Sequence, residues 1–447
     1  MEPPCRRRCT SSVGRTFGFA TVAVALLLAS GPAERPLRLK GPERQAKYLV
    51  GFVSKQDGAR LTPIGETLRE IGPRSKNLGF VDASAVSPQH DVVAIAAHAS
   101  NRSFADSLRF VALRNLRLLP RTVPLGGPVW TLLWRNPHRI VALVGDCCSP
   151  ESTIVVVDPG ARRVLSRETV GGAISALERD GGMLALLSTP VRAIGPAQLV
   201  VVDSVGTIRR VELTRIEAGT SWPADTNAPP LGTQRVPAVA LDAAGGHVYV
   251  VFPDGLGADV SLATLDLSYH QVATRSLGAR LTAWLQPAAQ AKGMNGVAWR
   301  GKWLGNGYVA VTGEEQHATL DANNRETMSG NPAGLAILDV RNWTIRTIDR
   351  GAGQVVVADG LLLATGRTWR TSDQRQTGMG LAAYGADTAM RFHLFAGSPA
   401  WIHAVWGGRA YVQGLGPATS VVELATGRVV EQRTGELPMP LLQDFDF

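Results

Sequence analysis

Residues 155–172 of this 447-residue chain are VVVDPGARRVLSRETVGG, and residues 421–435 are VVELATGRVVEQRTG. Each stretch places a run of apolar residues before a short polar turn and a second, alternating run after it, which is the pattern of a β-hairpin. Related stretches begin at Val111, Val200, Ala263, Ala336 and Ala382. The repetition of this unit, more than any single motif, predicts the fold.

A second hairpin precedes each of these units. Dipeptides such as Gly181-Gly182, Gly245-Gly246 and Asp359-Gly360 join its strands, and such pairs favour tight two-residue turns because they tolerate positive φ. Four strands therefore recur about every 45 residues, with longer intervals at insertions. This pattern predicts the blades of a β-propeller, because one blade cannot bury both of its faces whereas a closed ring of stacked blades can.

We expect an all-β protein with one propeller domain over residues 46–447, built from seven four-stranded blades. An additional strand pair over Tyr48–Val53 and Arg60–Ile64 precedes the first full blade. It closes the ring against Leu441–Phe447 or, as the alternative, builds a partial blade that raises the count to eight. Helical patterns are nearly absent; the short segment Leu68–Ile71 is the one candidate.

The N-terminus has the order of a secretory signal. A basic stretch, Arg6-Arg7-Arg8, precedes an apolar run over Phe17–Ala29, and small residues follow it. We expect residues 1–33 to be a signal peptide, with an uncleaved short membrane anchor as the alternative, and residues 34–45 to be a basic linker. The propeller is then extracellular, periplasmic or membrane-anchored outside the cytoplasm. Beyond the signal only Cys147 and Cys148 remain, so no disulfide framework holds the domain.

The stretches VVVDPGARRV and VVELATGRVV resemble the strand–D-x-x-T-G–strand hairpin of the secreted YVTN-type and quinoprotein-like β-propeller superfamily. The resemblance spans Val81 to Pro438. It implies a WD40-like repeat architecture in which Asp and Gly serve the turn, and it implies no particular ligand or reaction. The chain has no Trp-Asp dipeptide at a repeated position and no sialidase-type Asp box.

The charge of the chain argues against nucleic acid as a partner. The formal net charge is +9, from 46 basic and 37 acidic residues. The basic residues are scattered among carboxylates, whereas a nucleic-acid-binding protein presents a dense basic stripe that releases counterions. Six of the basic residues are Lys and the others are Arg. A membrane is expected as a partner only through the N-terminal segment, if that segment is not cleaved.

Two insertions from neighbouring blades, Gly313–Pro332 and Arg367–Gly378, are the most distinctive segments. We expect them to be long loops that wall a groove at one end of the ring, because long loops on a rigid scaffold commonly carry binding function. Insertions that merely pack onto the ring are the alternative. The candidate binding residues at this end are Trp222, Glu314, Glu315, His317, Asp321, Trp369, Arg370 and His403.

The function expected from these features is a non-catalytic binding or scaffold module that recognises a protein, glycan or small ligand on the long-loop face. The alternative is a lactonase-like propeller hydrolase or lyase with a metal in the central channel, using His403 and nearby carboxylates. No catalytic residue, metal ligand or cofactor is assigned. A calcium site at Asp321 is the weakest hypothesis, because the segment lacks the glycine and the full spacing of a calcium loop.

Overall fold

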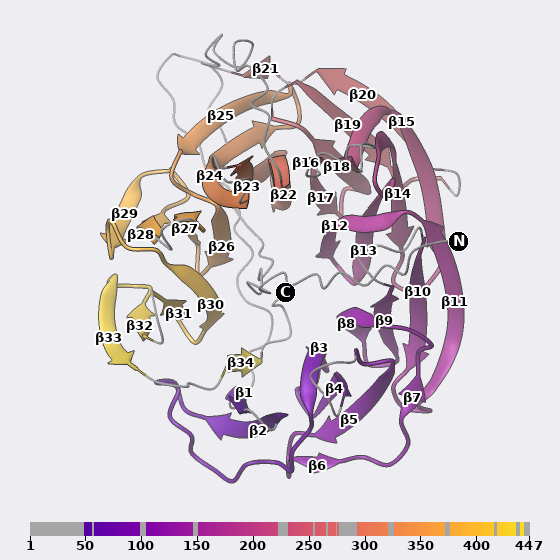
Figure 1. Cartoon of the computed structure of the whole chain (residues 1–447), viewed down its shortest axis with the longest axis vertical. Coiled ribbons are helices and arrows are strands. Elements are labelled where there is room, and N and C mark those ends of the chain that lie inside the picture. Colours follow the sequence, from indigo (N-terminus) through magenta and orange to yellow (C-terminus); the bar gives the residue numbers. More distant parts are fainter. Residues whose placement is uncertain are drawn as a thin grey trace.

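The computed structural model describes thirteen stretches of the chain, which are residues 49–55, 58–98, 104–145, 151–221, 231–253, 255–264, 267–273, 275–276, 293–320, 326–371, 376–414, 418–434 and 439–441. All the regular structure in these stretches is β-strand. Their sheets surround a central axis (Figure 1), which confirms the predicted propeller. The predicted signal and linker over residues 1–45 lie outside the described residues. No helix able to span a bilayer occurs in the described stretches.

Seven groups of four consecutive strands pair in antiparallel order. The first strand of each group lies nearest the axis (Figure 1); these strands are β3 (Phe80–Val86), β8 (Val129–Asn136), β12 (Ala173–Asp180), β17 (Ala238–Asp242), β22 (Gly293–Gly305), β26 (Gln354–Ala358) and β30 (Trp401–Trp406). The second strands are β4 (Val92–His98), β9 (Arg139–Val144), β13 (Met183–Thr189), β18 (His247–Val251), β23 (Tyr308–Leu320), β27 (Leu361–Arg370) and β31 (Arg409–Gln413).

The outer half of each group completes the hairpins that the sequence predicts. The third strands are β5 (Ser107–Ala112), β10 (Glu151–Asp158), β14 (Ile194–Val202), β19 (Leu256–Ser261), β24 (Glu326–Asp339), β28 (Gln376–Tyr384) and β32 (Thr419–Glu423). The fourth strands are β6 (Arg117–Leu118), β11 (Arg163–Gly171), β15 (Ile208–Ser221), β20 (Ser268–Ala273), β25 (Thr344–Asp349), β29 (Met390–Leu394) and β33 (Arg428–Arg433). Short strands β7 (Val123–Pro124) and β21 (Arg275–Ser276) pair with β5 and β25.

The two ends of the described chain meet in a closing sheet of three strands. Strand β1 (Leu49–Lys55) pairs with β2 (Gly58–Ile64) on one side and with β34 (Met439–Leu441) on the other. This sheet lies between the last and the first four-stranded groups (Figure 1). The structure thus has seven four-stranded units and a closing sheet in which the predicted strand pair meets a strand that contains Leu441. Seven or eight blades are counted according to whether this three-stranded sheet is called a blade.

The hydrophobic core is a set of clusters, each between two neighbouring sheets. Phe110 of β5 meets Trp134 of β8 edge-on, with ring centroids 6.4 Å apart. The closing sheet packs on both of its neighbours, because Ile64 shares a cluster with Tyr411 of β31 while Val50 shares another with Val93 of β4. Packing is therefore continuous around the described ring, and it buries the two faces that a single blade would leave exposed.

The recurring Asp at the end of the third strand organises the turn to the fourth. The Asp158 carboxylate accepts backbone N–H groups two and three residues further on, each at 2.9 Å. Asp203 accepts those two and four residues on, and Asp339 accepts the N–H of Arg341 at 3.0 Å. A short carboxylate side chain thus takes the place of a backbone acceptor in a tight turn. The predicted structural role of this Asp is confirmed.

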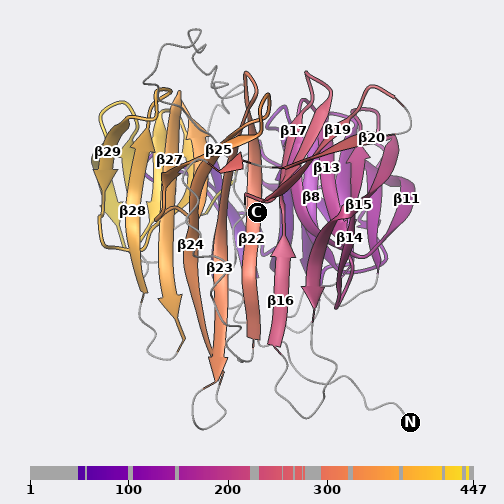
Figure 2. The same cartoon turned by 90° about the horizontal axis from the view of Figure 1, so that it is seen from above.

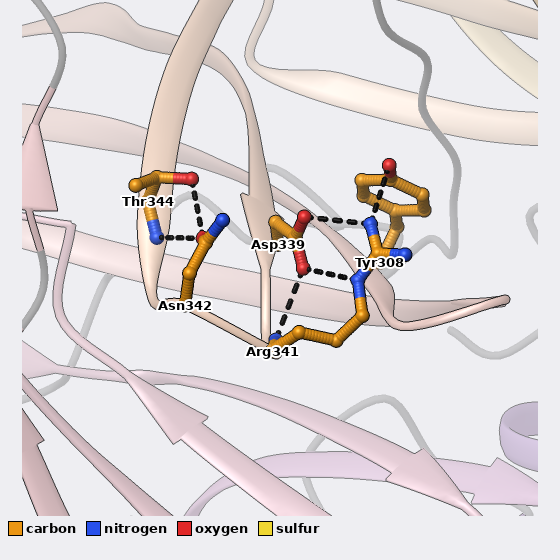
Figure 3. Close-up of polar contacts among 5 residues, drawn as sticks. All are labelled: Tyr308, Asp339, Arg341, Asn342 and Thr344. Carbon is orange, nitrogen blue, oxygen red and sulfur yellow. Dashed lines mark hydrogen bonds and ion pairs between the residues drawn. The ribbon is translucent and has the colours of Figure 1, made fainter. Parts of the chain in front are cut away.

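The turn after β24 also locks its own side chains together (Figure 3). The Arg341 guanidinium donates to both carboxylate oxygens of Asp339, at 2.6 and 2.8 Å, and to the hydroxyl of Tyr308 at 2.6 Å. Asn342 accepts the N–H of Thr344 at 3.0 Å and its hydroxyl at 2.6 Å. This network fixes one end of β24, and the opposite end of the same strand enters the candidate site.

Candidate functional site

Several strands run beyond the body of the ring at one end (Figure 2). Here β16 (Leu231–Val236) forms an antiparallel pair with the end of β15 and a parallel pair with β22. The sheet continues from β22 through β23, β24, β27 and β28. We call these seven strands, in the order β15-β16-β22-β23-β24-β27-β28, the extended sheet. It joins strands of the third, fifth and sixth four-stranded groups edge to edge, with β16 as the link between the third and the fifth.

The two distinctive insertions are strands, so their prediction as loops is wrong. The register of β23 with β24 runs out to Leu320 and Glu326, and that of β27 with β28 runs out to Trp369 and Gln376. The physical reason is pairing between the hairpins: Ser329 and Gly330 of β24 lie opposite Arg370 and Trp369 of β27. Backbone groups that a loop would leave to water find partners there. The expectation that the two insertions lie side by side is confirmed.

One face of the extended sheet carries Glu314 and Trp369, and we call it the Glu314 face. Side chains alternate along a strand, and directly paired residues share a face. The indole N–H of Trp369 donates to the Glu314 carboxylate at 2.9 Å. The ring crosses over Gly330, where an added Cβ would lie 2.2 Å from the indole nitrogen. Gly330 is therefore required for this contact.

The opposite face carries Glu315, His317 and Arg370, and we call it the His317 face. The His317 Nε2 lies 3.4 Å from a carboxylate oxygen of Glu315, and both side chains are partly exposed. Ser329 lies opposite His317 on one side and opposite Arg370 on the other, so these three residues form one row across β23, β24 and β27. The structure thus divides the predicted residues of the two insertions between two faces.

His403 lies apart from both insertions, on the innermost strand β30. Its Nε2 accepts the indole N–H of Trp401 at 3.0 Å, and the ring also contacts the side-chain amide of Gln413. Burial lowers the pKa of His403, while the contact with Gln413 opposes that shift. The Arg367 guanidinium stands over the Trp401 ring, 5.6 Å from its centroid. The neutral imidazole is therefore held by an aromatic and an amide neighbour.

The structure leaves part of the predicted set unplaced. Trp222 and Asp321 lie outside the described residues, so the calcium hypothesis at Asp321 stays a prediction. The described side chains contain no group of three or more His, Cys, Asp or Glu residues placed to hold a metal ion. The two predicted histidines have different neighbours: His403 on β30 contacts Trp401, and His317 on β23 contacts Glu315.

The comparisons with known proteins give no family. No protein-family model and no curated protein sequence matches the chain. Among solved structures, the chain is similar to the dihydro-heme d1 dehydrogenase NirN in complex with DHE, at 12% identity over 92% of this chain and 82% of that chain, with a TM-score of 0.49. It is also similar to apo AztD from Citrobacter koseri, at 10% identity over 88% of this chain and 96% of that chain, with a TM-score of 0.46. At these values the comparisons assign no ligand or reaction.

Two residues that the sequence did not single out belong to the Glu314 face. Arg300 on β22 lies directly opposite Thr312 on β23, and Thr312 lies two residues before Glu314 on the same face. Protein surrounds Arg300 closely enough that desolvation lowers its pKa, an effect that the Glu314 carboxylate partly opposes. In the sequence Thr312 is one more strand residue and Arg300 one more scattered cation, so no local pattern marks them.

Proposed function

We propose that this protein is an exported propeller that binds a ligand or partner at its extended sheet without catalysing a reaction. The supporting observation is the extension of strands from three different blades into one sheet beyond the ring. The ring itself supplies a rigid base, because its core is packed continuously between sheets. Paired strands that project from such a base present side chains in fixed positions, which lowers the entropic cost of binding.

The His317 face has the chemistry of a surface for a polar partner. Glu315 offers a carboxylate acceptor, His317 an imidazole, and Arg370 a planar guanidinium with several donors. The three residues lie close together on the strands β23 and β27, which both pair with β24. An Arg fork binds carboxylate and phosphate oxygens in a bidentate manner. A protein segment or a glycan with such groups is the partner class that this face favours.

The test removes the projecting hairpin and keeps the ring. Gln316 and Gly330 lie directly opposite each other, so residues 317–329 can be replaced by Asn-Gly, which favours a two-residue hairpin turn. We expect this variant to melt as cooperatively as the parent chain and to lose the partners that the parent captures from the exported fraction. A matched E315Q/H317Q/R370Q variant keeps the strands and removes the charges. Capture of the same partners by both variants, at the parent level, would refute the proposal.

A further inference from the structure

Trp369 is a tryptophan that the hydrophobic core does not use. Tryptophans of the ring pack in clusters between sheets, as Trp134, Trp303 and Trp343 do. Trp369 belongs to none of the core clusters of the described chain, and it is partly exposed. One side of its indole rests on the backbone of β24, because Gly330 has no side chain there. The exposed part of the ring therefore lies on the side away from that strand, where a ligand can stack on it.

Two polar side chains flank this ring on the same face, and both are partly exposed. The Glu314 carboxylate accepts the indole N–H with one oxygen, and within the described stretches its other oxygen has no hydrogen bond. Arg367 lies two residues before Trp369 on β27, so the two side chains point to the same face. The Arg367 guanidinium stands over Trp401, and no described residue forms a hydrogen bond or an ion pair with it. An aromatic ring, an acceptor and a set of donors are thus available to a ligand from solvent.

The charges of the two polar groups decide the class of ligand. One carboxylate and one guanidinium balance each other, so a charged ligand would meet a like charge as well as an opposite one. The complement is an uncharged ligand that both donates and accepts hydrogen bonds and has a flat apolar surface. Sugar hydroxyls donate and accept. The C–H groups on one face of a pyranose ring carry partial positive charge, which suits the electron-rich face of an indole.

From this arrangement we infer that the Glu314 face binds a neutral glycan. One sugar ring stacks on Trp369, one sugar hydroxyl donates to the Glu314 carboxylate, and another accepts from Arg367. Beyond Arg367, the partly exposed Trp401 continues the row of flat groups onto β30, the strand nearest the axis (Figure 1). The site therefore suits a chain of several sugar units. This inference names a ligand class for the extended sheet, and it rests on the proposed binding function.

The experiment is isothermal titration of the purified full chain with three neutral hexasaccharides, which are cellohexaose, chitohexaose and maltohexaose. We expect at least one of them to bind, with an affinity that salt does not change because the ligand carries no charge to be screened. Trp369→Ala is expected to weaken that binding about tenfold or more, since aromatic anchors dominate binding energy. Arg367→Gln is expected to weaken it about threefold to tenfold. Trp369→Tyr keeps an aromatic ring and should retain binding within about threefold, which separates lost stacking from a disturbed fold.

Trp130→Ala is the matched control, because Trp130 on β8 is another exposed tryptophan, 39% exposed and on a different blade. The affinity of this variant for the bound hexasaccharide should equal that of the parent chain. Decaproline is titrated in parallel, because proline-rich peptides also dock on aromatic-lined grooves. Binding of decaproline alone, no binding of any hexasaccharide, or binding that survives Trp369→Ala unchanged overturns the inference.

The glycan inference and the proposed function fail separately. Glu315, His317 and Arg370 lie on the opposite face, so E315Q/H317Q/R370Q should bind the hexasaccharide as the parent chain does. If no hexasaccharide binds while that variant still loses the captured partners, the glycan inference alone is refuted. If the hexasaccharide binds while this variant and the hairpin replacement both capture partners at the parent level, partner capture by the His317 face alone is refuted.

Discussion

At the scale of single residues, burial decides the behaviour of His403. Its pKa is lowered in the folded chain, so the unfolded chain binds more protons in the interval between that lowered pKa and the ordinary value of about 6.5. The contribution of His403 to stability is complete above about pH 6.5 and falls as the pH is lowered through this interval.

The prediction concerns His403→Gln, which removes the titration and keeps a polar side chain. We expect the free energy of unfolding of the parent chain to fall more steeply between pH 7.5 and pH 5 than that of the variant. Urea unfolding at the two pH values measures the difference. Parallel pH dependences would show that the buried imidazole does not contribute.

A second residue-scale prediction concerns the turn in Figure 3. Asp339→Ala removes the acceptor of the Arg341 backbone N–H and the carboxylate that pairs with its guanidinium. We expect a loss of about 1–2 kcal/mol in the free energy of unfolding. Asp339→Asn keeps one side-chain oxygen and should lose less. Equal losses for the two variants would mean that the backbone contact contributes nothing.

At the scale of strands and sheets, arginines link several neighbouring blades in the part of the chain that the structure describes. Arg209 of β15 donates to the carbonyl oxygens of Leu262 at 3.1 Å and Thr264 at 2.7 Å, in the group of strands that follows. Arg167 of β11 donates to the carbonyl of Pro124, at 3.0 Å, in the group that precedes. Both bonds of Arg209 come from its Nη1, which lies one bond farther along the side chain than the ammonium of a lysine would. The preponderance of Arg over Lys in the chain agrees with this use.

We therefore expect Arg209→Lys to lower the free energy of unfolding by about 1 kcal/mol, since the charge stays but the shorter side chain does not reach both carbonyls. Equilibrium urea unfolding measures the change. The same substitution at Arg428, which is exposed on the outer strand β33, is expected to change stability by less than about 0.5 kcal/mol. Indistinguishable effects at the two positions would contradict a linking role for Arg209.

A second feature at this scale is the contact between β19 and the turn after β24. Trp343 is buried there, and a Cβ added to Gly257 would lie 2.2 Å from its ring. We expect Gly257→Ala to cost about 1–3 kcal/mol through overpacking. The double variant Gly257→Ala/Trp343→Phe, with a smaller ring, should recover part of that loss. A double-mutant cycle on thermal unfolding decides whether the two positions couple.

The sequence predicted the hairpins because their strands alternate and their turns carry Gly or Asp. It failed at the extended sheet for a physical reason: the segment 314–317 of β23 is Glu-Glu-Gln-His, so it lacks the alternation of apolar and polar residues by which a strand is recognised. Pairing between β24 and β27 joins different blades and leaves no local pattern. The sequence does not single out Arg300 and Thr312, because the burial of a side chain and the lack of a hydrogen-bond partner are properties of the folded chain.

At the scale of the whole molecule, we expect the stability of the closed ring to depend on the closing sheet. Deleting residues 439–447 removes β34 and leaves the backbone groups of Val50–Phe52 on that edge of β1 without partners. We expect a lower midpoint of thermal unfolding and a greater tendency to aggregate, because an open strand edge pairs with other chains. Scanning calorimetry and size-exclusion chromatography measure the two effects.

Rescue provides the control for this deletion. A synthetic peptide of residues 439–447, added in trans, should restore the unfolding midpoint in a concentration-dependent way, because binding to the native state stabilises it by mass action. A truncated chain as stable as the parent, or a peptide without effect on a destabilised one, would show that the closing strand does not hold the ring.

The pairing of β1 with β34 also constrains the order in which the strands can pair during folding. Strand β1 is made before any other described strand, yet one of its partners, β34, is the last described strand to be made. Each four-stranded unit can therefore fold as soon as its own strands are available, whereas one edge of β1 stays unpaired until β34 is available. Contacts between such distant segments form slowly because a long loop must be closed first. The interval before closure is the period in which this chain most needs a chaperone.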